Sequence, residues 1–183
     1  MTYLHPTGNN LEGGDLTDFL QSIVVGITGL AGKRVRPRWQ AEPANIPSDG
    51  TSWASIGVTS TKSDTFPFVG QTINGAELQR HEEFDLDCSF YDLGDNGEAD
   101  QYASLLRDGL AIPENRQPLL DNNMGLIEVG DLITVPSLLK ERWLYRVDVK
   151  IRIRQEINRV YQVPSVETVT GTLYTSDGRQ RKI

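Results

Sequence analysis

The clearest pattern in the chain is an alternation of apolar and charged residues between Trp143 and Tyr161. Apolar residues occupy every second position, at Trp143, Tyr145, Val147, Val149, Ile151, Ile153 and Ile157. The positions between them carry Arg146, Asp148, Lys150, Arg152, Arg154 and Glu156. A period of two predicts a long β-strand with one apolar and one charged face, because helical spacing would scatter the same apolar side chains around a cylinder.

A second stretch, Glu83–Phe90, has the same period and the opposite charge. Its apolar positions are Phe84, Leu86, Cys88 and Phe90, and its polar positions are Glu83, Asp85, Asp87 and Ser89. We predict that the two stretches are neighbours in an antiparallel sheet, because opposite charges across two strands stabilise the pairing. The predicted charged sheet face then consists of Glu83, Asp85 and Asp87 lying across from Lys150, Arg152 and Arg154.

Weaker periodicities and turn residues predict the remaining elements. Helices are expected at 15–29, 96–108 and 113–124, with Asp15 and Asp95 as caps and Gly109 as a stop. Further strands are expected at 53–60 and 126–134, with an edge strand within 166–174, a hairpin connection at 63–76, a turn at 136–142 and a long loop at 33–50. This order predicts an α+β fold in which helices cover mainly one face of an antiparallel or mixed sheet.

The length of 183 residues suits one domain. We predict a flexible N-terminal arm at 1–14, a single α/β domain at 15–165, and a C-terminal edge strand and mobile tail at 166–183. The first residues lack the pattern of a secretory signal, and no apolar run is long enough to cross a membrane.

Charge and cysteine content narrow the classes of function. The net charge of −7 argues against nucleic-acid binding by the surface as a whole, because phosphate binding requires local basicity. The single cysteine, Cys88, has no partner for a disulfide and is expected to be a small core residue.

A cluster of cationic residues and one tryptophan stands out in the predicted long loop. It comprises Lys33, Arg34, Arg36, Arg38 and Trp39, and we call it the basic edge. We consider it a candidate interface with another copy of the chain or another protein, because long loops in small domains often carry function. Two alternatives remain open: a solvated corner in which Trp39 fills a gap, and stacking of Trp39 on nucleic-acid bases.

Candidate catalytic chemistry is sparse. Three carboxylates on one strand face, Glu83, Asp85 and Asp87, resemble a row that a metal-dependent nuclease could use. Pairing with the basic strand explains the same row without a metal. His5 and His81 lack the second ligand spacing of a zinc site. We therefore predict no catalytic residue, no metal site and no cofactor.

Several short motifs, taken as a set, resemble a known family over about residues 15–165. They are Val35–Gln40 with Glu42 and Pro43, Gly57–Ser60, Asp64–Pro67, Leu78–Glu82, Cys88–Tyr91, Leu106–Leu110, Ile112–Arg116, Met124–Leu126 and Arg142–Asp148. In these motifs the chain is similar to the neck terminator proteins of tailed bacteriophages. None of the motifs is a catalytic signature.

The resemblance implies a virion structural protein at the junction of head and tail, with a fold like that of tail terminators. It implies a ring, typically a homohexamer, that caps the tail tube protein, docks to the head-side connector or neck protein, and lets DNA pass without sequence-specific binding. Such a protein is made in the cytoplasm of the bacterial host and needs no membrane and no cofactor. Two alternatives remain: a nuclease using Glu83, Asp85 and Asp87, and a monomeric assembly adaptor.

Overall fold

The computed structural model of the protein describes residues 3–8, 10–40, 47, 50–72, 75–93, 97–135, 137–139, 142–162, 172–174 and 180–182. The helices are α1 (Gly13–Thr28), α2 (Glu98–Ala111) and α3 (Gln117–Asp121), with 3-10 turns η1 (Gly32–Arg34) and η2 (Pro113–Arg116). The strands are β1 (Pro6–Thr7), β2 (Val35–Pro37), β3 (Trp53–Ser63), β4 (Phe68–Thr72), β5 (Gly75–Asp92), β6 (Met124–Val129), β7 (Ile133–Thr134), β8 (Ser137–Leu139), β9 (Arg142–Gln162), β10 (Thr172–Tyr174) and β11 (Gln180–Lys182).

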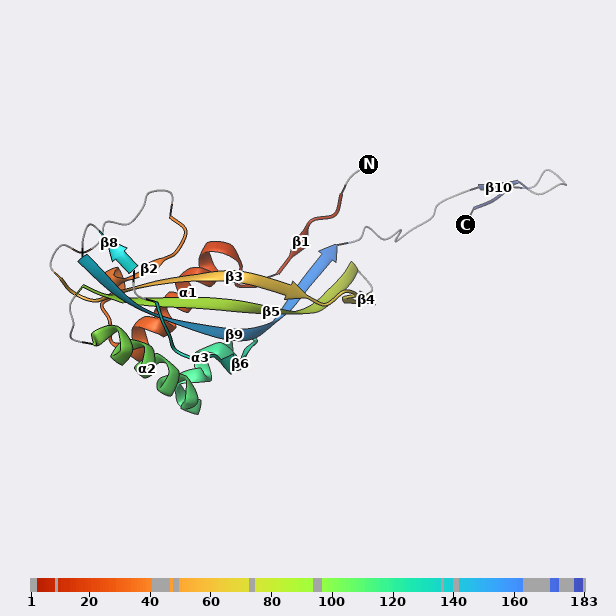
Figure 1. The fold of residues 1–183 in the computed structure, drawn as a ribbon. Helices are drawn as coiled ribbons and strands as arrows, with labels where there is room; N and C mark the ends of the chain where they lie inside the picture. Colours follow the sequence, from red (N-terminus) through yellow and green to blue (C-terminus); the bar gives the residue numbers. More distant parts are fainter. Residues whose placement is uncertain are drawn as a thin grey trace.

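The two long strands that the sequence predicts form the centre of a mixed sheet (Figure 1). β5 and β9 pair antiparallel along the whole of β5, from Gly75 opposite Gln162 to Asp92 opposite Tyr145. β3 and β4 pair with the other side of β5, and β2 adds to β3 in parallel. The other side of β9 carries β1, β6, β7 and β8. The fold is therefore α+β, as predicted.

The apolar rows of β5 and β9 face the helices and form the core. The buried residues of these rows that belong to the core cluster are Phe84, Leu86, Cys88 and Phe90 on β5 and Val147, Val149, Ile151 and Ile153 on β9. They join the same core cluster as Leu20 and Val24 of α1 and Leu106 and Leu110 of α2. Burial of each large side chain stabilises the fold by about 1.5–3 kcal/mol. The opposite face of the sheet carries the charged rows, and in the described part of the chain no helix covers it (Figure 1).

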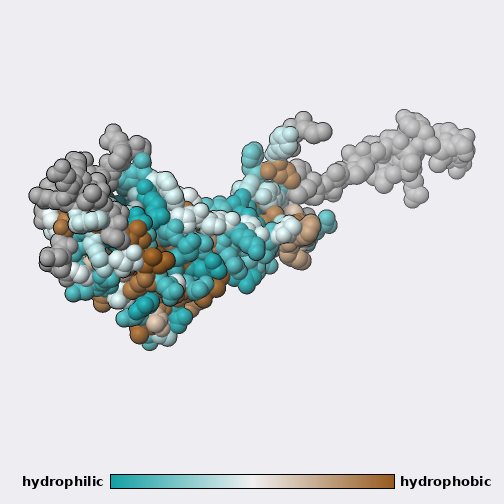
Figure 2. Space-filling model, viewed as in Figure 1, coloured by the Kyte–Doolittle hydropathy of each residue, from teal (hydrophilic) through white to brown (hydrophobic). Residues whose placement is uncertain are grey.

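The sheet is longer than the helical layer. At one end, β4 and the parts of β5 and β9 near Gly75 and Gln162 extend past the helices, as Figure 1 shows. We call this part, made of β4, 75–79 and 158–162, the projecting end. Apolar side chains are exposed there, and Figure 2 shows apolar residues at this end of the molecule.

The ends of two predicted helices are corrected. α1 begins at Gly13 with Glu12 at the cap position, so Asp15 lies in the first turn and does not cap the helix. α2 continues past Gly109 to Ala111. The missing side chain of Gly109 makes room for the Ile27 methyl group of α1. Gly109 thus serves close helix packing. Asp95 lies outside the described residues, and the cap position of α2 is Gly97.

Several loops contain more structure than predicted. The expected loop at 33–50 begins with η1 and β2, whose Val35 is buried in the core. The expected helix at 113–124 is two short pieces that end at Asp121, and the strand at 126–134 is divided into β6 and β7. The expected turn at 136–142 contains β8, which pairs with the start of β9.

The terminal segments also differ from expectation. In the predicted flexible arm, Pro6 and Thr7 pair with the end of β9, and the Asn10 side-chain amide donates to the Asn158 carbonyl at 2.8 Å. At the other end, β10 pairs with β11 in a separate two-stranded sheet and not at the edge of the main sheet. Residues 163–171 and 175–179 of the predicted edge strand and tail lie outside the described residues.

Candidate functional site

The charged sheet face has the register that the sequence predicts. Glu83 lies opposite Arg154, Asp85 opposite Arg152, and Asp87 opposite Lys150. The prediction of this antiparallel pairing is therefore confirmed. It follows from the two alternating patterns, because a slip of one residue between the strands would turn the apolar row of one of them away from the helices.

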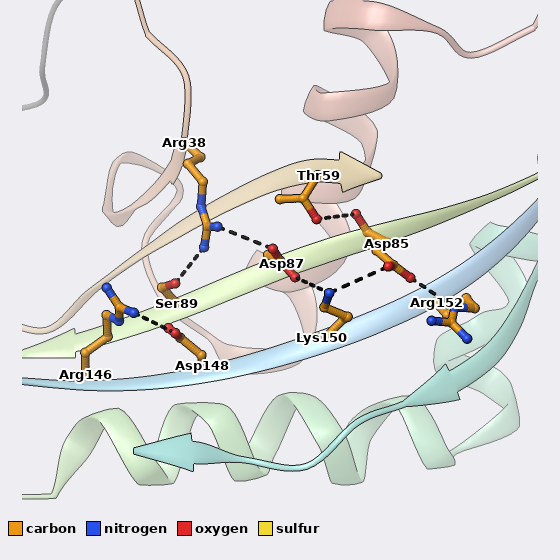
Figure 3. Close-up of polar contacts among 9 residues, drawn as sticks. All are labelled: Arg38, Thr59, Asp85, Asp87, Ser89, Arg146, Asp148, Lys150 and Arg152. Carbon is orange, nitrogen blue, oxygen red and sulfur yellow. Dashed lines mark hydrogen bonds and ion pairs between the residues drawn. The ribbon is translucent and has the colours of Figure 1, made fainter. Parts of the chain in front are cut away.

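Ion pairs join the centre of this face (Figure 3). The guanidinium Nε of Arg152 donates to Asp85 Oδ1 at 3.0 Å, and the Lys150 ammonium lies 3.6 Å from Asp85 Oδ2 and 3.9 Å from Asp87 Oδ1. The hydrogen bond with Asp85, together with its charge, raises the pKa of Arg152. Two carboxylates of the row are thus already matched by cations, which favours pairing over the nuclease alternative.

The third register pair behaves differently. Among the described residues, no ion pair joins Glu83 and Arg154, although they are opposite each other in the sheet. Both line an open polar hollow of about 150 Å³ with Asp64 and His81. The backbone N–H of His81 donates to Asp64 Oδ2 at 2.9 Å, and this bond lowers the pKa of the Asp64 carboxyl.

Arg38 links the basic edge to the charged sheet face, a contact that the sequence does not reveal. Its Nη2 donates to Ser89 Oγ at 2.7 Å, and its Nη1 lies 3.4 Å from Asp87 Oδ2 (Figure 3). The backbone N–H of Arg38 also donates to the Ile56 carbonyl of β3 at 2.6 Å. The chain therefore folds over the open face of the sheet just after β2.

Trp39 lies on the surface of β3 above Gly57. A Cβ at Gly57 would be 2.6 Å from Trp39 Cζ3 and 2.9 Å from Arg38 Cβ, so the glycine lets the two side chains approach the strand. Trp39 nevertheless keeps 63% of its surface exposed. It does not fill a core gap, and the interpretation of the basic edge as a plain solvated corner loses its main support.

The basic edge borders an open hollow between two tryptophans. Arg36, Arg38, Trp39 and Trp53 line it, and its volume is about 360 Å³. The Trp53 ring stacks on Tyr91 with centroids 3.9 Å apart, and the Arg36 guanidinium lies 5.9 Å from the Trp53 ring. The structure thus brings Arg36, Arg38 and Trp39 of the predicted cluster together with Trp53, for which the sequence predicts only a place in a strand. Lys33 and Arg34 lie in η1 and do not line this hollow.

The single cysteine has the predicted core position. Cys88 is fully buried on the apolar row of β5, and burial raises the pKa of its thiol. A thiol in this state is poorly reactive. Within the described ranges, no three His, Cys, Asp or Glu side chains are grouped as metal ligands would be.

The paired charges, the exposed tryptophan and the hollow beside it are typical of proteins that act by contact with other proteins. The chain belongs to the family of phage neck terminator proteins, whose family model matches residues 14–178. It is accordingly a structural protein of the virion neck, and the resemblance noted in the sequence is confirmed. A comparison with curated protein sequences finds no match. In the described part of the chain, no helix combines the length and apolar content needed to cross a membrane.

Proposed function

We propose that this chain is the subunit of a closed ring, a homohexamer, that caps the tail tube and docks it to the head-side connector. Subunits are made in the host cytoplasm, and DNA passes through the finished ring without sequence-specific binding. The observation that carries the proposal, beside the family, is the basic edge with its exposed Trp39. Tryptophan and arginine are the side chains that most often dominate binding energy at protein interfaces.

The distribution of charge along α1 supports contact between copies. Asp15 and Asp18 are exposed in its first turns, whereas Lys33 and Arg34 follow its other end. The helix has 16 residues and is therefore about 24 Å long. Each copy thus presents acidic and basic groups at separate places, which favours head-to-tail contact, and head-to-tail contacts generate rings when the rotation closes.

The net charge of −7 supports the passage of DNA. A ring of such subunits repels the phosphate backbone over most of its surface, so DNA has little tendency to adhere to it. The basic edge is compatible with this role if it is covered by the neighbouring copy. A basic edge that stayed accessible in the ring and bound DNA would contradict this part of the proposal.

The experiment is light scattering of the purified protein over a concentration series, with negative-stain imaging, alone and with purified tail tubes. We expect closed rings of one size, or rings that form on tube ends. Trp39→Ala should abolish them. The matched control is Trp143→Ala, because Trp143 is 68% exposed, lies at the start of β9 and is not among the described residues that line the hollow beside the basic edge.

Two results would contradict the proposal. If wild-type protein stays monomeric alone and does not bind tube ends, the monomeric adaptor becomes the better interpretation. If Trp39→Ala assembles as well as wild type, the basic edge is not the interface.

A further inference from the structure

β4 is an edge strand at the projecting end of the sheet, and within the described ranges it pairs only with β5. Its residues Phe68–Thr72 carry no charge and include no proline, and their register with β5 is continuous. The outward N–H and C=O groups of such a strand form a template for another strand.

Two other edges of the main sheet, β2 and β6, carry features that prevent strand addition. β2 contains Arg36 and Pro37, and the proline has no N–H to donate. β6 has a register shift between Leu126 and Glu128, and the glutamate adds a charge at the irregularity. Charges, prolines and bulges are the usual means of blocking an edge, so β4 stands out as unprotected.

The side chains of β4 also lack cover. Phe68 and Val69 are exposed, although neighbours on a strand point to opposite faces, and Phe66 in the preceding turn is exposed as well. Both faces of this end are therefore open to solvent, as expected where the sheet extends past the helices (Figure 1). A free edge with apolar side chains on both faces fits an added strand better than a docked helix, which would cover one face only.

Among the described residues, the chain also contains a pair of strands that is separate from the main sheet. β10 and β11 pair with each other and with no strand of the main sheet. An isolated two-stranded hairpin is marginally stable in water, and a third strand stabilises it. The family match continues to residue 178, past the end of β9, so β10 belongs to the part shared with the family.

The charges on β11 and beside β4 have opposite signs, which favours a contact between the two segments. β11 carries Arg181 and Lys182. The exposed carboxylates nearest β4 are Asp64, just before it, and Glu77, opposite Gly70 of β4. Attraction between opposite charges on two approaching segments helps to select the partner.

We propose that the β10–β11 hairpin of one copy adds to the free edge of β4 in a second copy, so that the sheet continues from subunit to subunit. β4 and β9 run in the same direction, since both are antiparallel to β5. The chain therefore leaves β9 at Gln162 heading off the sheet and two strands away from its own free edge. The ten residue steps from Gln162 to Thr172 span up to about 35 Å, enough to reach a neighbour. This inference rests on the proposed ring and adds a second contact to it.

The test is disulfide trapping between two variants of the full chain that each add one cysteine, Gln71→Cys on β4 and Gln180→Cys on β11. Native Cys88 is buried and does not contribute. The two variants are mixed, allowed to assemble at the concentration that gives rings or on tail tubes, and oxidised. We expect a disulfide-linked dimer that neither variant forms alone.

Other cross-linking patterns would overturn the proposal. A dimer from Gln71→Cys alone means that β4 pairs with β4 of another copy. In the double variant, a disulfide within one chain means that the hairpin returns to its own sheet. Absence of any cross-link in assembled rings refutes the hairpin contact and leaves the ring intact, whereas absence of both cross-links and rings refutes the ring as well.

A matched pair of substitutions tests the edge itself. Val69→Lys places a charge on β4, and Ile127→Lys places the same charge on the protected strand β6. The two side chains are 55% and 47% exposed, so both substitutions should leave the fold intact, which circular dichroism checks. We expect Val69→Lys to lower the yield of the cross-link at least tenfold and Ile127→Lys to leave it unchanged. Equal yields would refute the role of β4.

Discussion

Arg38 fixes the basic edge to the sheet through two interactions of different strength. Its hydrogen bond to Ser89 Oγ is 2.7 Å long, and Ser89 is 1% exposed. A hydrogen bond between a charged donor and a buried acceptor stabilises by about 1.5–3 kcal/mol. The contact with Asp87 is 3.4 Å long between side chains that are 29% and 23% exposed, and such partly solvated pairs contribute about 0.2–1 kcal/mol. We predict that the hydrogen bond to the neutral Ser89 contributes more to the stability of the fold than the contact with the charged Asp87.

Two double-mutant cycles measure this difference. They combine Arg38→Met with Ser89→Ala and Arg38→Met with Asp87→Asn, and urea unfolding at pH 7 gives the free energy of each variant. We expect the Arg38–Ser89 coupling to exceed the Arg38–Asp87 coupling by about 1 kcal/mol. Added salt should weaken mainly the coupling with Asp87, because screening acts on the pair of full charges.

The control is the exposed pair Arg107–Asp108 of α2, 3.6 Å apart, whose coupling should be close to zero. An Asp87 coupling equal to or larger than the Ser89 coupling would refute the reasoning. So would a loss of stability in Arg38→Met without coupling to either partner, because the effect would then come from packing of the side-chain stem.

Three further predictions concern the core and the acid response. Ile151→Ala should lower the free energy of unfolding by about 2–5 kcal/mol, and Ile127→Ala on the exposed side of β6 by less than about 1 kcal/mol, as measured in urea. The Cys88 thiol should react with Ellman's reagent only as fast as the protein opens, and rapid reaction of the native state would contradict its burial. Hydrogen bonds donated by Asn158 and Gln79 lower the pKa of Glu156 below its ordinary 4.5. The stabilisation that ionised Glu156 gives the fold is therefore complete above pH 4.5 and is lost as pH falls through the lower pKa of the folded state. The stability advantage of wild type over Glu156→Gln should accordingly shrink in acid titrations below pH 4.5.

The long elements of the fold could be predicted from the sequence because their patterns are long. In β5 and β9 the alternation continues for eight or more residues, and opposite charge on the two polar rows specifies the register. β2 has three residues, too few to establish a period, and Pro37 argued against a strand. The predicted helix stop at Gly109 is wrong because a glycine can either end a helix or allow close packing, and only the neighbouring helix shows which applies.

The candidate site could be predicted only in part. The sequence identified the basic edge and the charged sheet face, but not the contacts of Arg38 with Asp87 and Ser89, which are 49 and 51 residues away. One available signal was Gly57 within an otherwise β-prone strand, since glycine there often marks a close approach. Its partner, Trp39, could not be inferred. The free edge of β4 depends on which strands pair, and that follows from the whole topology.

The long β5–β9 pairing has a consequence for the order of folding. Gly75 and Gln162 are separated by roughly 90 residues, and Asp92 and Tyr145 by roughly 50. The free-energy cost of closing these two loops differs by only about 0.4 kcal/mol. Burial decides between the two ends, because Phe90 and Val147 lie in the core, while no helix of the described residues packs against the residues near Gly75. The β5–β9 pairing should therefore form first at the Asp92 end. The rate of backbone amide hydrogen exchange should increase along β5 toward Gly75. The edge of β4 is then completed last, so a chain becomes able to pair with a neighbour only after its own core has formed.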